Sequence, residues 1–346
     1  GNTVLGETAL DASVSGGNNT AIGKDALTAL TSVLGETALD ASVSGGNNTA
    51  IGKDALTALT SGATNVAVGH SALAANTTAS NNTALGESAL QLNSTGTDNT
   101  AVGSGALDAS TTADNLTAVG RNALGANTTG EQNTAVGASA LIANTTGRRG
   151  TAIGYGALST NTTGEENVAA GRLALQDNTT GNNNVAIGNG SLAENTTASN
   201  NTAVGLSALG LNTTGAGNTA VGYQSLDANT TASNNTAMGL SALGANTTGT
   251  SNVAVGANAL DANTAGNFST AVGFDCLTNS TGSFNTGVGG NCLKTNVGGQ
   301  NNCGLGTSAL ELNTTGSNNV AVGQAALVSN TTADDNTAVG HDCLRS

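Results

Sequence analysis

The sequence predicts an all-β parallel β-solenoid, or β-roll, and two observations lead to this prediction. A glycine followed four residues later by leucine recurs twenty-one times, usually with seventeen residues from one copy to the next. The 346 residues include 50 glycines but no proline, no tryptophan, two tyrosines and three phenylalanines. Short self-similar units bury their apolar face by stacking on one another, so residues 1–346 are expected to form a single repeat-built shaft of about 21 coils.

Each repeat, numbered from its glycine as position zero, begins with a short predicted strand. Asparagine is common at −4, threonine or valine at −3, alanine at −2 and an aliphatic residue at −1, as in residues 133–137. Alternation along a strand predicts that −3 and −1 share one face, with Ala −2 and the glycine on the other. The alanine and leucine at +3 and +4 predict a second short strand. The Asn-Thr-Thr-Gly segment that follows, as in residues 144–147, predicts a turn.

The repeat assigns structural roles to three sets of residues. Aliphatic residues at −1 and +4 are expected to form the core or a contact with another chain: Val136, Leu141, Ile153, Leu158, Leu175, Ile187, Leu192, Val204 and Leu209. Glycines at position zero are expected to end the strand in a turn: Gly137, Gly154, Gly171, Gly188 and Gly205. Stacked asparagines at −4 and +7 are expected to hydrogen-bond along the axis as ladders: Asn133, Asn144, Asn167, Asn184 and Asn201.

The seventeen-residue register breaks twice. Residues 4–32 recur letter for letter as residues 33–61, and between these copies the step from Gly23 to Gly35 is only twelve residues. A local irregularity is therefore expected near residues 28–33. The step from Gly273 to Gly289 is sixteen residues, which predicts one residue lost from the turn at residues 278–282.

The charge balance disfavours several classes of partner. The formal net charge is −14, with only eight lysines and arginines. Phosphate binding needs a clustered basic footprint, so no nucleic-acid partner is expected. No run of residues has the length and apolarity of a membrane span.

The residues that carry catalysis are sparse and scattered. His70 and His341 both occupy position +1 but lie sixteen repeats apart, so they cannot join one catalytic relay. Paired carboxylates such as Glu165 and Glu166 fall in the variable turn. We therefore expect no enzyme activity, no cofactor and no metal site.

The four cysteines, Cys276, Cys292, Cys303 and Cys343, lie in the last quarter of the chain, and all but Cys303 replace the alanine at +3. Cys276 and Cys292 fall on consecutive coils, which predicts that they stack. Two interpretations remain open: a disulfide between coils, or thiols that pack as slightly larger alanines.

The stretch N-[T/V]-A-[V/I]-G-x-x-[A/S], as in residues 133–140 and 184–191, resembles the head repeat of trimeric autotransporter adhesins. It is also similar to shaft repeats of phage tail fibres. The resemblance covers nearly the whole chain and implies a parallel β-roll in which three chains wind about one axis, outside a cell or on a virion. It also implies adhesion to a surface receptor or glycan through a repetitive face. The coiled-coil stalk and membrane anchor of an autotransporter are not recognisable in this sequence.

The leading functional hypothesis is a stiff, non-catalytic extracellular fibre or adhesin shaft, formed as a homotrimer. A stripe of apolar residues left outside each coil would need such a partner, and Leu +4 or the alanine-rich face is expected to line the contact. An ice-binding solenoid is the alternative, although no strand carries the T-x-T pattern that would favour it. A further alternative is a filament subunit that stacks end to end through its open strand edges.

Overall fold

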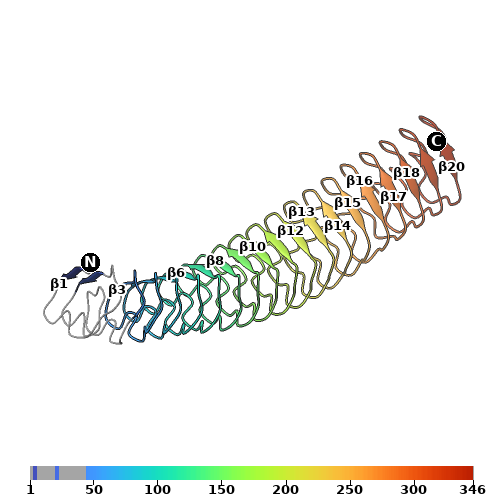
Figure 1. Cartoon of the computed structure of the whole chain (residues 1–346). Helices are drawn as coiled ribbons and strands as arrows, with labels where there is room; N and C mark the ends of the chain where they lie inside the picture. The colour runs from blue at the N-terminus through green and yellow to red at the C-terminus, as the bar shows by residue number, and fades with distance from the viewer. Residues whose placement is uncertain (1–2, 6–19, 23–43, 346) are drawn as a thin grey trace. The chain divides into compact units, whose positions relative to one another are not determined.

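The computed structural model describes residues 3–5, 20–22 and 44–345. The chain divides into two compact units, Gly1–Leu173 and Ala174–Ser346, and each unit is a parallel β-solenoid (Figure 1). The described residues contain no helix. The expected seventeen-residue coil is therefore confirmed, with one three-residue strand in each coil.

The strands repeat the same short segment before each repeat glycine. The first unit contains β1 Thr3–Leu5, β2 Thr20–Ile22, β3 Thr49–Ile51, β4 Val66–Val68, β5 Thr83–Leu85, β6 Thr100–Val102, β7 Thr117–Val119, β8 Thr134–Val136, β9 Thr151–Ile153 and β10 Val168–Ala170. The second contains β11 Val185–Ile187, β12 Thr202–Val204, β13 Thr219–Val221, β14 Thr236–Met238, β15 Val253–Val255, β16 Thr270–Val272, β17 Thr286–Val288, β18 Cys303–Leu305, β19 Val320–Val322 and β20 Thr337–Val339.

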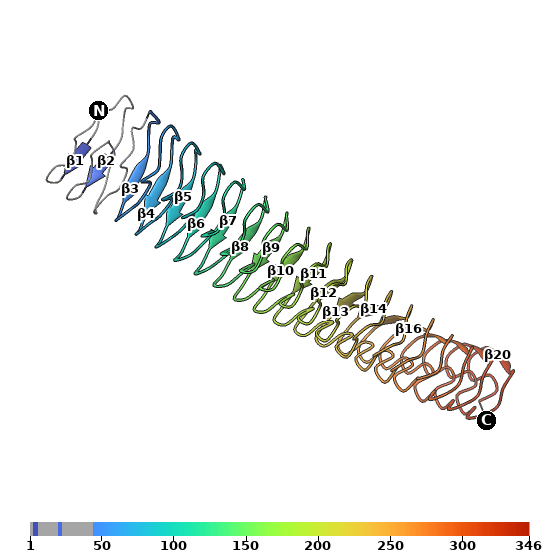
Figure 2. The ribbon, with the colours of Figure 1, turned by 90° about the horizontal axis from the view of Figure 1, so that it is seen from below.

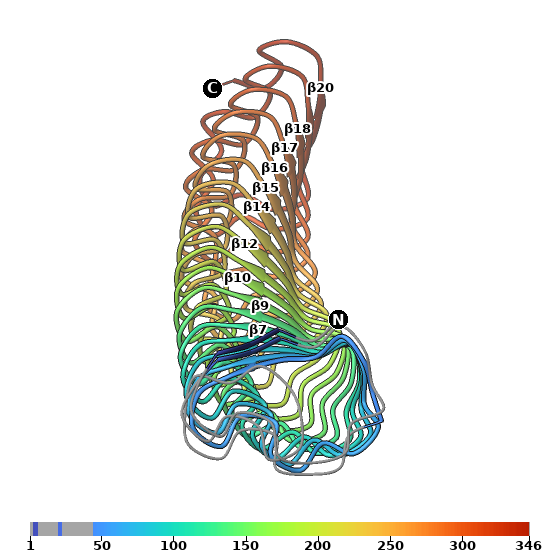
Figure 3. The same ribbon diagram turned by 60° about the vertical axis from the view of Figure 1, so that its left-hand side comes forward.

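Within each unit, consecutive strands pair in parallel and in register (Figure 2). Thr134 lies opposite Thr151 in the first unit, and Thr202 lies opposite Thr219 in the second. In most coils, therefore, the same repeat position of neighbouring coils is stacked, and the coils follow one another as Figure 3 shows.

The strands on either side of both breaks in the repeat still pair with each other. β2 pairs directly with β3 at Thr20 and Thr49, which are 29 residues apart (49 − 20). The expected irregularity at residues 28–33 and most of the duplicated segment lie outside the described residues. β16 pairs in register with β17, Thr270 opposite Thr286, so the shortened repeat loses its residue from the turn, as predicted.

The predicted second strand is wrong. Residues +1 to +6 form consecutive turns instead, although Leu +4 still donates its backbone N–H to the next coil, as from Leu124 to the Ala140 carbonyl at 3.0 Å. The backbone at +2 and +4 is left-handed, with φ of 58° at Ser139 and 50° at Leu141. This conformation turns two successive side chains, Ala140 and Leu141, into the interior, which an extended strand cannot do.

The core consists of three small or medium apolar residues per coil. Ala −2, Ala +3 and Leu +4 are buried in nearly every described coil, and Leu141, Leu158, Leu175, Leu192 and Leu209 are at most 1% exposed. The prediction that Leu +4 or the alanine-rich face lines a chain contact is therefore wrong. The −1 residues point outward instead: Val136, Ile153 and Ile187 are exposed, and Val204 is half-buried.

The repeat glycines end each strand in a backbone conformation that disfavours other residues. Gly137, Gly154, Gly171, Gly188 and Gly205 have φ between 131° and 145°. A Cβ built on Gly137 would lie 2.5 Å from the Gly154 carbonyl oxygen of the next coil. Glycine is required here by both conformation and close backbone stacking.

Two ladders of buried asparagines connect the coils, as the sequence predicts. At −4, Asn133 Oδ1 accepts the Gly150 N–H at 2.7 Å, and its Nδ2 donates to the Gly147 carbonyl at 2.8 Å. Asn184 Oδ1 accepts the Asn201 N–H in the same way at 3.0 Å, and Asn167 is also buried. The hydrogen bond between coils in this ladder is donated by the backbone N–H of the −4 residue, which any residue except proline has. Leu116 and Gly150 can therefore occupy −4 and still donate to the asparagine of the preceding coil.

In the second ladder, at +7, hydrogen bonds between side-chain amides join one coil to the next. Asn144 Nδ2 donates to Asn127 Oδ1 of the preceding coil at 2.7 Å and to the Gly147 carbonyl at 3.0 Å. In the first unit Ser110 occupies this position, and its hydroxyl has no partner among the described residues. Asn76 Oδ1 and Asn93 Oδ1 are also buried without a partner, so this ladder is interrupted from Asn76 to Ser110.

Replacing Ser110 by Asn should repair this ladder, because the longer amide reaches Asn93 Oδ1 as its counterparts do elsewhere. We expect a gain of about 1 kcal/mol in the free energy of unfolding, measured by guanidinium denaturation. The matched control, Asn144→Ser, breaks an intact ladder and should cost about 1–3 kcal/mol. A stability loss in Ser110→Asn would contradict the ladder geometry.

Candidate functional site

The outward side of the strands forms an extended, uniform surface in each unit. We call the residues at −3 and −1 of β3–β10 and of β11–β20 the strand face. Neither row contains an Asp, Glu, Lys, Arg or His in the described coils. The exposed fractions of Ile153 and Ile187 are 47% and 42%. A row of exposed aliphatic residues that continues over many coils, as at −1, is typical of interaction sites.

The two ends of each strand carry the exposed residues that vary most from coil to coil. We call position −5 the −5 flank and position +1 the +1 flank. All five aromatic residues of the chain lie on these flanks, and each is about half exposed or more: Tyr155, Tyr223, Phe268, Phe274 and Phe284. Phe268 stacks on Phe284 of the next coil, with ring centroids 5.4 Å apart and planes inclined by 10°. Sequence reasoning missed these flanks, although their even spacing from −3 and −1, which places all four positions on one face of an extended strand, was a readable signal.

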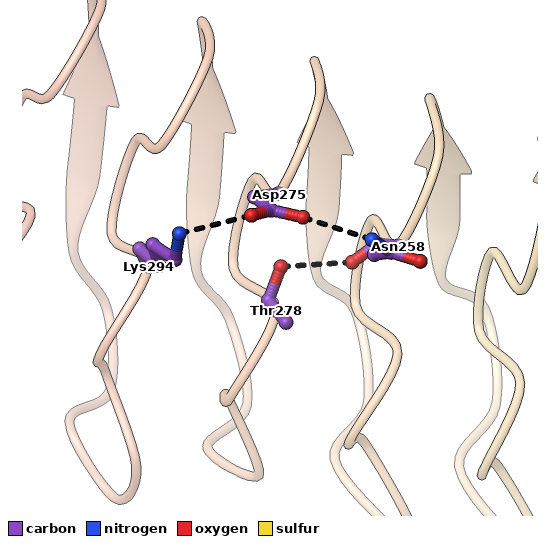
Figure 4. A network of polar contacts seen from close by, with 4 residues as sticks. All are labelled: Asn258, Asp275, Thr278 and Lys294. Carbon is purple, nitrogen blue, oxygen red and sulfur yellow. Dashed lines mark hydrogen bonds and ion pairs between the residues drawn. The ribbon is translucent and has the colours of Figure 1, made fainter.

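A polar network spans three consecutive coils of the second unit (Figure 4). Asp275 accepts hydrogen bonds from Asn258 Nδ2 at 3.0 Å and from Lys294 Nζ at 2.9 Å, while Thr278 Oγ1 donates to the Asn258 carbonyl at 2.9 Å. The hydrogen bond from Asn258, followed by that from Lys294, lowers the pKa of Asp275. This carboxylate therefore stabilises the fold in its charged form.

Three other aspartates, which all occupy position +5, have a raised pKa instead. Burial raises the pKa of Asp108, Asp227 and Asp261, and Asp108 Oδ1 is buried without a hydrogen-bond partner. Asp227 and Asp261 line one shallow hollow together with Ser241 and Gly244. The charged form of these carboxylates opposes folding.

Replacing Asp275 and replacing Asp227 by asparagine should change the stability of the fold in opposite directions, and both changes should depend on pH. Asp275→Asn should reduce stability at pH 7, and the loss should fade as the pH falls below the ordinary carboxyl pKa of about 3.9, through the lowered value in the folded state. Asp227→Asn should raise stability at pH 7, and its gain should fade as the pH falls through the raised pKa. Thermal unfolding of both variants from pH 7 to pH 3 measures this, and parallel shifts at all pH values would contradict it.

The predicted stacking of Cys276 and Cys292 is present, with both as buried free thiols. A hydrogen bond with Cys276, and then burial, raise the pKa of Cys292. Each sulfur occupies space that the next coil vacates, because Gly287 and Gly304 replace the usual Ala −2. A Cβ at Gly287 would lie 2.6 Å from Cys276 Sγ, and one at Gly304 would lie 2.5 Å from Cys292 Sγ. This compensation supports the packing interpretation of these thiols.

This pairing predicts a strong energetic coupling. Gly287→Ala should destabilise the protein by about 1–3 kcal/mol through overpacking against Cys276 Sγ. Adding Cys276→Ala should restore most of the loss, because the pair then matches Ala259 and Ala271 of neighbouring coils. A double-mutant cycle in guanidinium measures the coupling. Additive losses would contradict direct contact between the two positions.

The remaining candidate catalytic residues lie apart on the surface. His70 Nε2 lies 3.7 Å from Asp54 Oδ2, and His341 Nδ1 lies 3.3 Å from Asp342 Oδ2. Glu166 pairs with Arg149 of the preceding coil. Within the described ranges, no three His, Cys, Asp or Glu residues are grouped so as to hold a metal ion, and no helix is long and apolar enough to cross a membrane.

Comparison with known proteins adds no relative. No protein-family model matches the chain, and no curated protein matches it. The fold itself defines the chain as a parallel β-solenoid repeat protein. The similarity to adhesin and tail-fibre repeats depends on the repeat motif alone.

Proposed function

We propose that the chain is a non-catalytic structural fibre shaft whose copies associate side by side through the strand face. The observation that carries this proposal is the absence of charged residues from both rows of that face in every described coil. A solvated surface on a chain with 22 acidic residues would be expected to receive some of them.

The dimensions of this face suit a contact between chains. With coils about 4.8 Å apart and about 3.3 Å per residue, the strand face together with its two flanks covers roughly 90 Å² per coil. The ten strands of the second unit would then offer about 900 Å² per partner, which reaches the size of a standard stable interface. A second copy has the same coil spacing and thus matches this surface along its length.

A homotrimer on a cell surface or virion is the form that the adhesin-like repeat favours. In that setting the shaft holds a binding region away from its anchor, and a surface receptor or glycan is its partner. End-to-end stacking into filaments is the variant of this proposal in which the coil edges also pair.

Light scattering on the purified protein should give a mass near three times 33.0 kDa. Ile153→Asp combined with Ile187→Asp should dissociate the assembly to folded monomers, because each places a charge on the strand face without entering the core. Circular dichroism verifies that the variant stays folded. Leu141→Asp is the matched control and should unfold its coils instead, since Leu141 is buried.

An unmodified protein of 33.0 kDa in solution would contradict self-association and favour ice binding. One observation supports that second candidate: threonines at +9 form an exposed row, for example Thr129 and Thr146 in the first unit and Thr214 and Thr231 in the second. Thermal hysteresis of a freezing solution tests this function directly.

A further inference from the structure

In four described coils, the −5 flank and the +1 flank of the same coil carry complementary side chains. In the first unit Glu166 accompanies Arg172, two opposite charges, and Arg149, which also pairs with Glu166 within the chain, accompanies Tyr155, a cation and an aromatic ring. In the second unit Phe268 accompanies Phe274, and Asp335 accompanies His341. Each of these residues is exposed, and each pair suits a direct contact.

One chain cannot make these contacts itself. The two flanks lie six residues apart on either side of a three-residue strand, a separation of at most about 20 Å along the backbone. Among the described residues, the ring contact of Phe268 is with Phe284 of the next coil. The pairs are therefore complementary between copies of the chain.

The complementarity also selects a register. No described coil has like charges on its own two flanks. A shift of one coil in one direction would place Arg149 against Arg172, and a shift in the other would place Asp98 against Glu87. Unshifted pairing avoids both repulsions and sets Phe268 against Phe274, whereas the shift that opposes Asp98 and Glu87 would set Phe284 against Phe274.

We infer that the −5 flank of one copy packs against the +1 flank of a second copy, coil for coil. This inference builds on the proposed side-by-side association. Rotation about an axis parallel to the stacking direction keeps equal coils at equal height, so any closed parallel ring brings these two flanks together. An antiparallel pair would instead set one −5 flank against another −5 flank, in reversed order.

Phe268 and Phe274 form the anchor of this contact in the second unit. Both are more than half exposed, and Phe268 is supported from behind by its stacking on Phe284. Aromatic side chains that become buried in an interface contribute a large share of its binding energy.

Disulfide trapping between two differently labelled copies tests the pairing. We would prepare Phe268→Cys and Phe274→Cys as separate proteins, both carrying Cys303→Val and Cys343→Ala, the residues found at −3 and +3 of neighbouring coils. Cys276 and Cys292 stay in place because they are fully buried. The two proteins are co-refolded in equal amounts and oxidised with a copper–phenanthroline complex.

The mixed sample should convert part of its monomer band on a denaturing gel into a band at twice 33.0 kDa, because the inferred contact places the two substituted positions side by side and each mixed trimer leaves one copy unlinked. Each protein oxidised alone should remain monomeric on the gel. As a register control, Asn301→Cys mixed with Phe274→Cys should not link, since these positions lie two coils, or about 10 Å, apart along the stack.

Linking by Phe268→Cys alone would overturn the inference in favour of an antiparallel pair. Equal linking in the Asn301 control would overturn the register, and no linking in any sample that is multimeric by light scattering would overturn the contact itself. In each of these outcomes the proposed fibre stands. A monomeric unmodified protein instead contradicts the proposed function.

Discussion

Hydrogen bonding between neighbouring coils is the constraint on which the rest of this structure depends. A coil of seventeen residues encloses only two alanines, one leucine and two asparagine amides, which is too little apolar surface to hold a fold alone. The buried amides of Asn133 and Asn144 have their partners in the coil itself and in the adjacent coils. A single coil would leave these amides unpaired, at a cost of several kcal/mol. Folding and stacking are therefore one process.

The narrow interior explains why the chain exposes its larger side chains. Stacked coils leave room for alanine at −2 and +3, and even one sulfur, at Cys276, requires a glycine opposite it. An aromatic ring does not fit such an interior, so all five aromatic residues lie on the flanks. The narrow core thus fixes which residues occupy the interior, and variation is confined to the outer surface.

Much of the fold could be read from the sequence, because a strict repeat reports which positions stack. The parallel strand before each glycine, the inward Ala −2 and both asparagine ladders follow from periodicity and side-chain chemistry. The turns at +1 to +6 could not, because left-handed backbone at residues such as Ser139 and Leu141 has no signature when glycine is absent. This error moved Leu +4 to the surface and hid the outward role of −1. The flanks were missed because −5 was treated as a variable turn.

A uniform repetitive face provides affinity but no register. Threonine and valine at −3 and aliphatic residues at −1 recur in nearly every coil, so sliding one copy by a coil restores almost the same contacts. Strands with undifferentiated pairing are prone to such slippage. Only rows that differ from coil to coil can set a unique alignment, and in the described chain those rows include both flanks. The residues that differ between coils, among them Glu166, Phe268 and Phe274, are thus the ones able to set a unique register between copies of the chain.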